Sequence, residues 1–152
     1  MSSKAEGGLR WRRWLLRAHI SLVATLIPLA DNFLSLKELM RLLAPPRWWR
    51  PYRGTSAEEV LALVSRRLEN PRNMRRRSCL RHGLTLFHFL KLAGYAPVLQ
   101  IGVFPPAPGA ARMLAHCWVT LDGVCLCSPP DQPTAVVVRH GGDGGMISEE
   151  SS

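Results

Sequence analysis

The sequence predicts an α+β fold, in which N-terminal helices pack around a central helix that lies against a small antiparallel sheet. Two observations predict this class. Apolar residues recur at helical spacing as far as Ala93, and short β-branched runs bounded by Gly and Pro follow them. The length of 152 residues and the hydrophobic fraction of 47% suit one globular domain with its own core.

Three helices are expected ahead of the central one. They cover residues 9–26, residues 34–43, and a segment that begins after the N-cap Ser56 and stops at Pro71. Ser35 and Glu38 form a candidate capping box for the second of them. Residues 1–8 are small and polar, and we expect them to form a loose tail.

The first of these helices carries an apolar stripe. Apolar residues recur at helical spacing from Trp14 to Phe33, and we expect this stripe to pack on the domain. Its uncharged part, residues 18–30, is shorter than the roughly 20 residues that a membrane span needs. Peripheral membrane contact is the secondary alternative.

The central helix should cover residues 79–93, with Ser78 as its N-cap and Gly94 at its end. It is apolar nearly all round, which is typical of a buried helix. The sheet should follow, with Asp122-Gly123 as a tight turn and strands over residues 97–104, 113–121, 124–127 and 135–139.

The net charge of +9 belongs to the first half of the chain. Residues 1–78 hold 16 Lys and Arg against 6 Asp and Glu, a net charge of +10, whereas residues 79–152 carry −1. Such a half can face nucleic acid, an anionic membrane or an acidic protein, or form an Arg-rich solvated surface. Residues 47–54 mix aromatic and basic side chains, as single-strand binders do. We favour a loop pinned onto the domain, so nucleic acid is not an expected partner.

The cysteines indicate reduced thiols. Cys79, Cys117, Cys125 and Cys127 are too few for a disulfide scaffold, which favours a cytoplasmic protein. The Cys-x-Cys spacing is a poor zinc pattern, so we expect no metal. Instead, Cys125 and Cys127 should alternate on one buried strand face.

Cys79 and His116 are the candidate catalytic pair. A thiolate in the first turn of a helix is stabilised by the helix dipole and by free N–H groups, and the arginines at 75–77 add positive potential. An imidazole on a neighbouring strand can take the thiol proton and return it to a leaving amine. Of the other histidines, we expect His82 to pack or to line the groove and His88 to be structural.

Three stretches resemble the leader peptidases of lasso-peptide biosynthesis, a bacterial branch of the transglutaminase-like superfamily. They are Ser-Cys-Leu at residues 78–80, the glycine before an Ile-Gly-Val strand at residues 94–103, and Ala-His-Cys-Trp-Val ending in Asp-Gly at residues 115–123. The resemblance implies a transglutaminase-like or papain-like core in which Cys79 is the nucleophile and His116 is the general base.

The resemblance also implies a function and partners. A cysteine peptidase of this kind removes the leader from a ribosomally synthesised precursor peptide in the bacterial cytoplasm. A small leader-binding protein presents the leader, an ATP-dependent macrocyclase closes the ring, and the peptidase needs no cofactor. The alternatives are a non-catalytic transglutaminase-like module that binds a peptide or partner, and an Arg-rich adaptor for a membrane surface or nucleic acid.

The third catalytic residue departs from the family pattern. Aligned through the Asp-Gly turn, Ser128 stands where the family has its aspartate, and Cys127 stands for an asparagine. Asp131, three residues later, is the candidate substitute. Loss of the residue that orients the histidine costs such enzymes several orders of magnitude in rate.

The expected organisation has three parts. Residues 1–55 form an N-terminal basic helical region, and residues 56–140 form the transglutaminase-like catalytic core. Residues 141–152 form a flexible tail rich in Gly and Ser.

Overall fold

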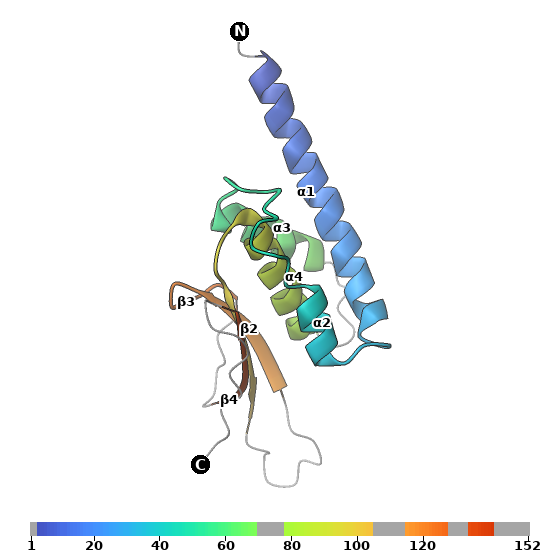
Figure 1. The fold of residues 1–152 in the computed structure, drawn as a ribbon, viewed down its shortest axis with the longest axis vertical. Helices are drawn as coiled ribbons and strands as arrows, with labels where there is room; N and C mark the ends of the chain where they lie inside the picture. Colours follow the sequence, from blue (N-terminus) through green and yellow to red (C-terminus); the bar gives the residue numbers. More distant parts are fainter. Residues whose placement is uncertain (1–2, 70–77, 105–114, 128–133, 142–152) are drawn as a thin grey trace.

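In the described part of the chain, four helices lie to one side of a four-stranded antiparallel sheet (Figure 1). The computed structural model describes residues 3–69, 78–104, 115–127 and 134–141. The elements in chain order are α1 (Ser3–Ala30), α2 (Leu36–Leu42), α3 (Ala57–Leu68), α4 (Ser78–Ala93), β1 (Val98–Val103), β2 (Ala115–Leu121), β3 (Val124–Cys125) and β4 (Ala135–Gly141). The predicted α+β class is confirmed.

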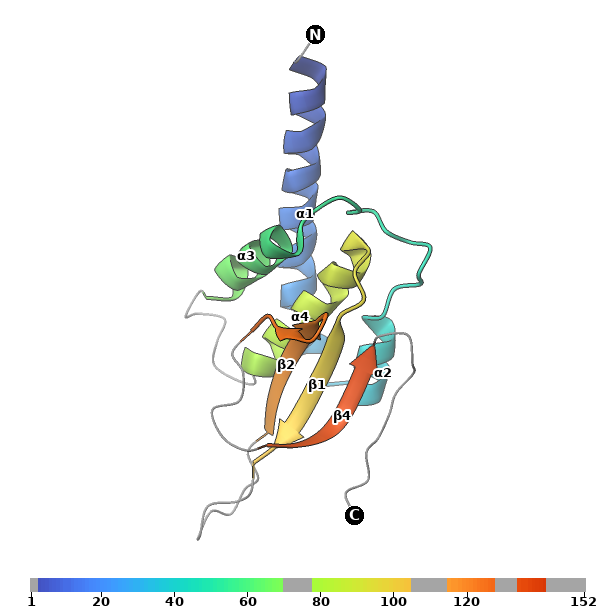
Figure 2. The ribbon, with the colours of Figure 1, turned by 90° about the vertical axis from the view of Figure 1, so that its left-hand side faces the viewer.

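The sheet has the strand order β3-β2-β1-β4, and α4 lies across one of its faces (Figure 2). In the β1–β2 ladder Gly102 lies opposite His116, and Ile101 lies opposite Cys117. Because side chains alternate along a strand, Ile101 and Cys117 share the face that α4 covers, and His116 leaves β2 on the other face. The register of the sheet therefore decides which side of β2 each site residue faces.

One hydrophobic core joins the helices to the sheet. As predicted, α4 is buried nearly all round, and α1 and α3 pack on it on the side away from the sheet. The core continues from Leu16 and Leu39 in the N-terminal helices, through α4, to Leu99 and Val119 in the sheet. The functional division of the chain at residue 55 stays a prediction.

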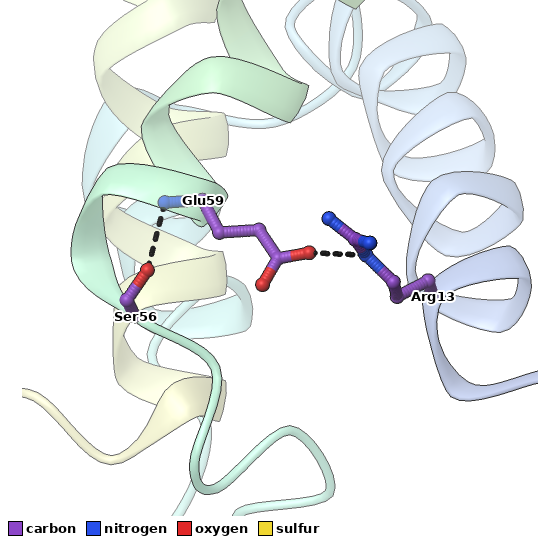
Figure 3. Close-up of polar contacts among 3 residues, drawn as sticks. All are labelled: Arg13, Ser56 and Glu59. Atoms are coloured by element: carbon purple, nitrogen blue, oxygen red, sulfur yellow. Dashed lines mark hydrogen bonds and ion pairs between the residues drawn. The ribbon is translucent and has the colours of Figure 1, made fainter. Parts of the chain in front are cut away.

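Local signals fix the starts of α2 and α3. The side chains of Ser35 and Ser56 both cap their helices, as the sequence predicts. At Ser56 the hydroxyl accepts a hydrogen bond of 3.1 Å from the Glu59 N–H. The Glu59 carboxylate in turn lies 2.6 Å from Arg13 Nε, which ties α3 to α1 (Figure 3). Ser78, by contrast, is the first residue of α4 rather than its N-cap.

Two expectations for α1 are wrong. The helix begins at Ser3, so most of the expected tail over residues 1–8 is helical. The stripe that was expected to pack on the domain is exposed, at Trp14, Leu22 and Phe33. The residues of α1 that pack into the core are Leu16, Ile20, Ala24 and Ile27. Helical spacing could not choose between these faces because both are apolar. No described helix combines the length and the apolar character that crossing a membrane requires.

The aromatic and basic segment after α2 is pinned onto the domain, as predicted. The Tyr52 N–H donates to the Leu92 carbonyl at 3.2 Å, and the Tyr52 Oη lies 2.9 Å from His19 Nδ1. Arg12 Nη2 donates to the carbonyls of Pro51 and Arg53. These bonds hold the segment against α1 and the end of α4.

Candidate active site

Cys79 is the second residue of α4, and its half-buried thiol is not in a disulfide. The start of α4 lies beside β2 (Figure 2). Gly83, one helical turn after Cys79, faces β2 so closely that a Cβ on it would lie 2.6 Å from Cys117 Sγ. A glycine allows this approach because it has no side chain. The first turns of α4 therefore lie directly against the strand that carries His116.

Cys117 is the thiol that faces α4. Burial, followed by the nearby Cys79 and Cys127 thiols, raises its pKa far above the ordinary range. The Cys79 thiol also contributes to the raised pKa of Cys127, so the thiols of Cys79, Cys117 and Cys127 lie near one another. At neutral pH, Cys117 is protonated and presents no thiolate.

Cys127 ends the β3 strand earlier than the sequence predicts. The Val119 N–H donates to Cys127 Sγ at 3.2 Å, so a sulfur takes the place of a strand carbonyl. The assigned strand ends at Cys125, although the Leu126 N–H still donates to the Val119 carbonyl at 2.9 Å. The Cys125 thiol donates to the Cys127 carbonyl at 2.7 Å. The expected strand over residues 124–127, with Cys125 and Cys127 alternating on one face, is therefore wrong. Burial raises the pKa of Cys127 to about 11.

His116 is half-buried near the start of β2 and lies among aromatic rings. Its imidazole stacks on Trp118 with ring centres 5.9 Å apart and planes 22° apart, and Phe104 lies 6.3 Å away. Opposite His116, a Cβ on Gly102 would lie 2.9 Å from Trp118 Cη2. The bare glycine thus makes room for the indole that supports the imidazole.

The structure places Cys79 and His116 on an adjoining helix and strand. The link runs from Cys79 through Gly83 to Cys117, which follows His116 in β2. In the described part of the sheet, β3 pairs with β2 only at Thr120 and Leu121, so the β2 edge near His116 is not covered by β3. Ser128, Asp131 and the arginines at 75–77 lie outside the described residues.

The three histidines of the helices, His19, His82 and His88, contribute to the packing of the helices. His82 Nε2 lies 3.3 Å from Ser65 Oγ in α3, and burial lowers its pKa. His88 Nδ1 lies 2.9 Å from the Leu43 carbonyl, so its predicted structural role is confirmed. His19 contacts Tyr52 and lies edge-on to Phe89 with ring centres 5.0 Å apart.

Sequence reasoning missed the two glycines that shape the site. Gly83 stands four residues after Cys79 inside an otherwise apolar helix, and Gly102 interrupts the β-branched run of β1. A glycine inside a helix or strand pattern often marks a close approach of two backbones, and that signal was present in both places. Across the residues that the structure describes, no group of three or more His, Cys, Asp or Glu side chains is placed to hold a metal ion.

Comparison with known proteins agrees with this architecture. The profile of the transglutaminase-like superfamily matches residues 9–138, which run from α1 into β4 and include both Cys79 and His116. No curated protein and no solved structure gave a match. The superfamily includes cysteine proteases, which fits a thiol at the start of a buried helix. Because the match covers far more than half of the chain, this protein belongs to the transglutaminase-like superfamily.

Proposed function

We propose that the protein is a cysteine peptidase that removes the leader from a ribosomally synthesised precursor peptide in lasso-peptide maturation. One observation carries the proposal: the first turns of α4, which hold Cys79, lie against the strand that holds His116 in a member of the transglutaminase-like superfamily. The stretches around these residues resemble leader peptidases, and this resemblance supports the substrate class.

In the proposed reaction, Cys79 Sγ attacks the scissile carbonyl carbon while His116 takes the thiol proton. The C–N bond then breaks, His116 gives the proton to the leaving amine, and the leader stays on Cys79 as a thioester. Water, activated by His116, hydrolyses the thioester and restores the thiol. Free backbone N–H groups at the start of α4 are suited to hold the oxyanion.

The surroundings support these roles. Cys117 and Cys127 remain protonated at neutral pH, so neither supplies a competing thiolate next to Cys79. Trp118 and Phe104 support the imidazole from the outer face of the sheet. Because His116 and Cys117 leave β2 on opposite faces, His116 would meet Cys79 around the β2 edge that β3 does not cover. Asp131 is the proposed residue that orients the imidazole.

The proposed setting is the bacterial cytoplasm, together with a leader-binding protein and an ATP-dependent macrocyclase. Reduced cysteines fit that compartment, since the four thiols are free. Presentation of the leader by a separate protein would let a domain of this size act on one defined bond.

The test is cleavage of candidate precursor peptides from neighbouring genes, mixed with the purified protein and the leader-binding protein and followed by mass spectrometry. Wild type and the matched thiol variant Cys125→Ala should release the leader, and Cys79→Ala should not. His116→Ala should lower the rate by about 10³-fold or more. If the wild-type protein binds the precursor but does not cleave it, the chain is a non-catalytic binding module.

A further inference from the structure

Large hydrophobic side chains form an exposed row on α1 and in the turn after it. We call this row the outer stripe, and its exposed fractions run from 39% at Leu15 to 86% at Phe33. Single exposed hydrophobic residues are ordinary, but a contiguous row marks an interaction surface. The members of the outer stripe are Trp11, Trp14, Leu15, Leu22, Leu26, Leu29 and Phe33.

The outer stripe lies on the side of α1 that faces away from the core. At 100° per residue, Trp11, Leu22 and Leu29 lie roughly 160–180° around the helix from the buried Ile20. The N-terminal end of α1 projects beyond the rest of the fold (Figures 1 and 2), and Trp11 and Trp14 belong to the N-terminal half of this helix. These two indoles stack with ring centres 5.2 Å apart. The stripe is therefore open to a flat, extended partner.

Positive charge borders the outer stripe on both sides. From residue 7 to residue 30 the helix has four arginines and no Asp or Glu. By the same rotation, the exposed Arg10 and Arg17 lie on one flank of the stripe and Arg12 lies on the other. The fourth, Arg13, turns inward to Glu59.

A basic cavity lies between α1 and α3, beside one of these flanks. Arg17, Arg66 and Arg67 line it, and no carboxylate is among its described lining residues. Arg67 Nε donates to Ser21 Oγ at 3.1 Å, which fixes that guanidinium against α1. The flank is thus suited to anionic groups such as phosphate esters.

We propose that α1 binds an anionic membrane surface, with the outer stripe in the lipid interface and the flanking arginines at the phosphates. Helices that lie in this interface combine Trp, Phe and Leu on one face with bordering Arg and Lys, and Trp favours the headgroup level. If a second copy of the chain packed on the outer stripe, the arginines of the two helices would lie close together. Residues 7–30 contain no acidic side chain that could offset their repulsion. Charge therefore favours lipid phosphates over self-association.

The test is co-sedimentation of the full chain with vesicles of phosphatidylcholine, alone or mixed in equal parts with phosphatidylglycerol. The wild-type protein should bind the mixed vesicles and lose binding as salt is raised. Leu22→Glu/Leu29→Glu should weaken binding by about tenfold or more. The control Val124→Glu/Val137→Glu makes the same charge change at exposed valines of the sheet. It should bind the mixed vesicles more tightly than Leu22→Glu/Leu29→Glu does.

Three outcomes would overturn the proposal. They are equal binding to vesicles with and without phosphatidylglycerol, equal losses in the two double-Glu variants, and absence of vesicle binding. If the protein does not bind vesicles, light scattering shows whether another protein chain covers the outer stripe. A dimer that Leu22→Glu/Leu29→Glu dissociates assigns the stripe to a second copy, and a stripe-dependent complex with the leader-binding protein assigns it to that partner. Neither readout depends on Cys79, so failure here is separate from failure of the proposed peptidase.

Discussion

Cys117 Sγ lies over Gly83, only 2.6 Å from the place that a Cβ on this glycine would take. The contact sets how closely α4 approaches β2, one helical turn after Cys79. It also fixes which residue of β2 faces the helix, since Cys117 occupies that face and His116 leaves on the other. The position of Cys79 relative to the sheet therefore depends on Gly83 and on the buried Cys117 thiol, and neither takes part in the proposed chemistry.

Gly83→Ala should lower the free energy of unfolding by up to about 2 kcal/mol. Overpacking costs about 1–3 kcal/mol, and the better helix propensity of Ala returns about 1 kcal/mol. In a Cys117→Ala background the same change should cost less, because the sulfur is gone and the remaining tight neighbour is Leu99 Cδ1 at 3.2 Å. Denaturant unfolding of the four proteins measures this coupling, and equal effects of Gly83→Ala in both backgrounds would exclude the contact. Gly8→Ala is the matched control, since a Cβ there meets nothing within 4 Å.

Acid should destabilise the fold through His88. Burial lowers the pKa of His88 below its ordinary value near 6.5. As the pH falls below 6.5, His88 is therefore protonated in the unfolded chain before it is protonated in the native state. The contribution of His88 is therefore complete above pH 6.5 and is lost as the pH falls below that value, by at most about 1.4 kcal/mol per pH unit. Unfolding between pH 7.5 and 5.5 should show a slope to which His88 contributes, together with His19, His82 and His140, whose pKa values burial also lowers. His88→Asn, which keeps an amide near the Leu43 carbonyl, should reduce it; an unchanged slope would refute the assignment.

Cys127 should react slowly with iodoacetamide until the solution is strongly alkaline. Its pKa near 11 means that the thiolate fraction still rises about tenfold per pH unit through pH 10. A cysteine with the ordinary pKa of about 8.5 reaches its full rate by roughly pH 9.5. Peptide mapping after timed alkylation gives the rate at Cys127, and a plateau at or below pH 9.5 would contradict its burial.

The ion pair between Arg13 and Glu59 should contribute less than the cap at Ser56. Arg13 is more than half exposed, so a double-mutant cycle with Arg13→Gln and Glu59→Gln should give a coupling of about 0.2–1 kcal/mol that shrinks in high salt. Ser56→Ala removes the hydrogen bond to the Glu59 N–H and should cost about 1 kcal/mol at any salt concentration. A coupling that salt leaves unchanged would mean that the pair is shielded from solvent.

The sequence predicted the elements whose limits are set by neighbouring residues. Ser35 and Ser56 mark the starts of two helices, and Gly94, with a φ of 97°, follows the end of α4 as expected. The buried face of α1 was not predictable, because apolar residues occupy two opposite sides of it. The end of β3 was not predictable either, because it depends on the hydrogen bond from the Val119 N–H to the Cys127 sulfur, and that contact exists only after folding.

The site was predictable in its parts but not in its register. A thiol near the start of a buried helix follows from local sequence, and Cys79 is found there. That Cys117, rather than His116, faces α4 depends on how the helix settles on the sheet, and a period of two residues leaves both choices open. The orienting residue remains a prediction, since Asp131 lies outside the described residues.

Cys79 is the proposed nucleophile of a leader peptidase. The most direct measurement is acid quenching of the protein during reaction with its precursor and the leader-binding protein, followed by intact mass spectrometry and peptide mapping. We expect a transient thioester between the leader and Cys79, absent in Cys79→Ala and present in Cys125→Ala. A thioester on another cysteine, or leader release by Cys79→Ala at the wild-type rate, would contradict it.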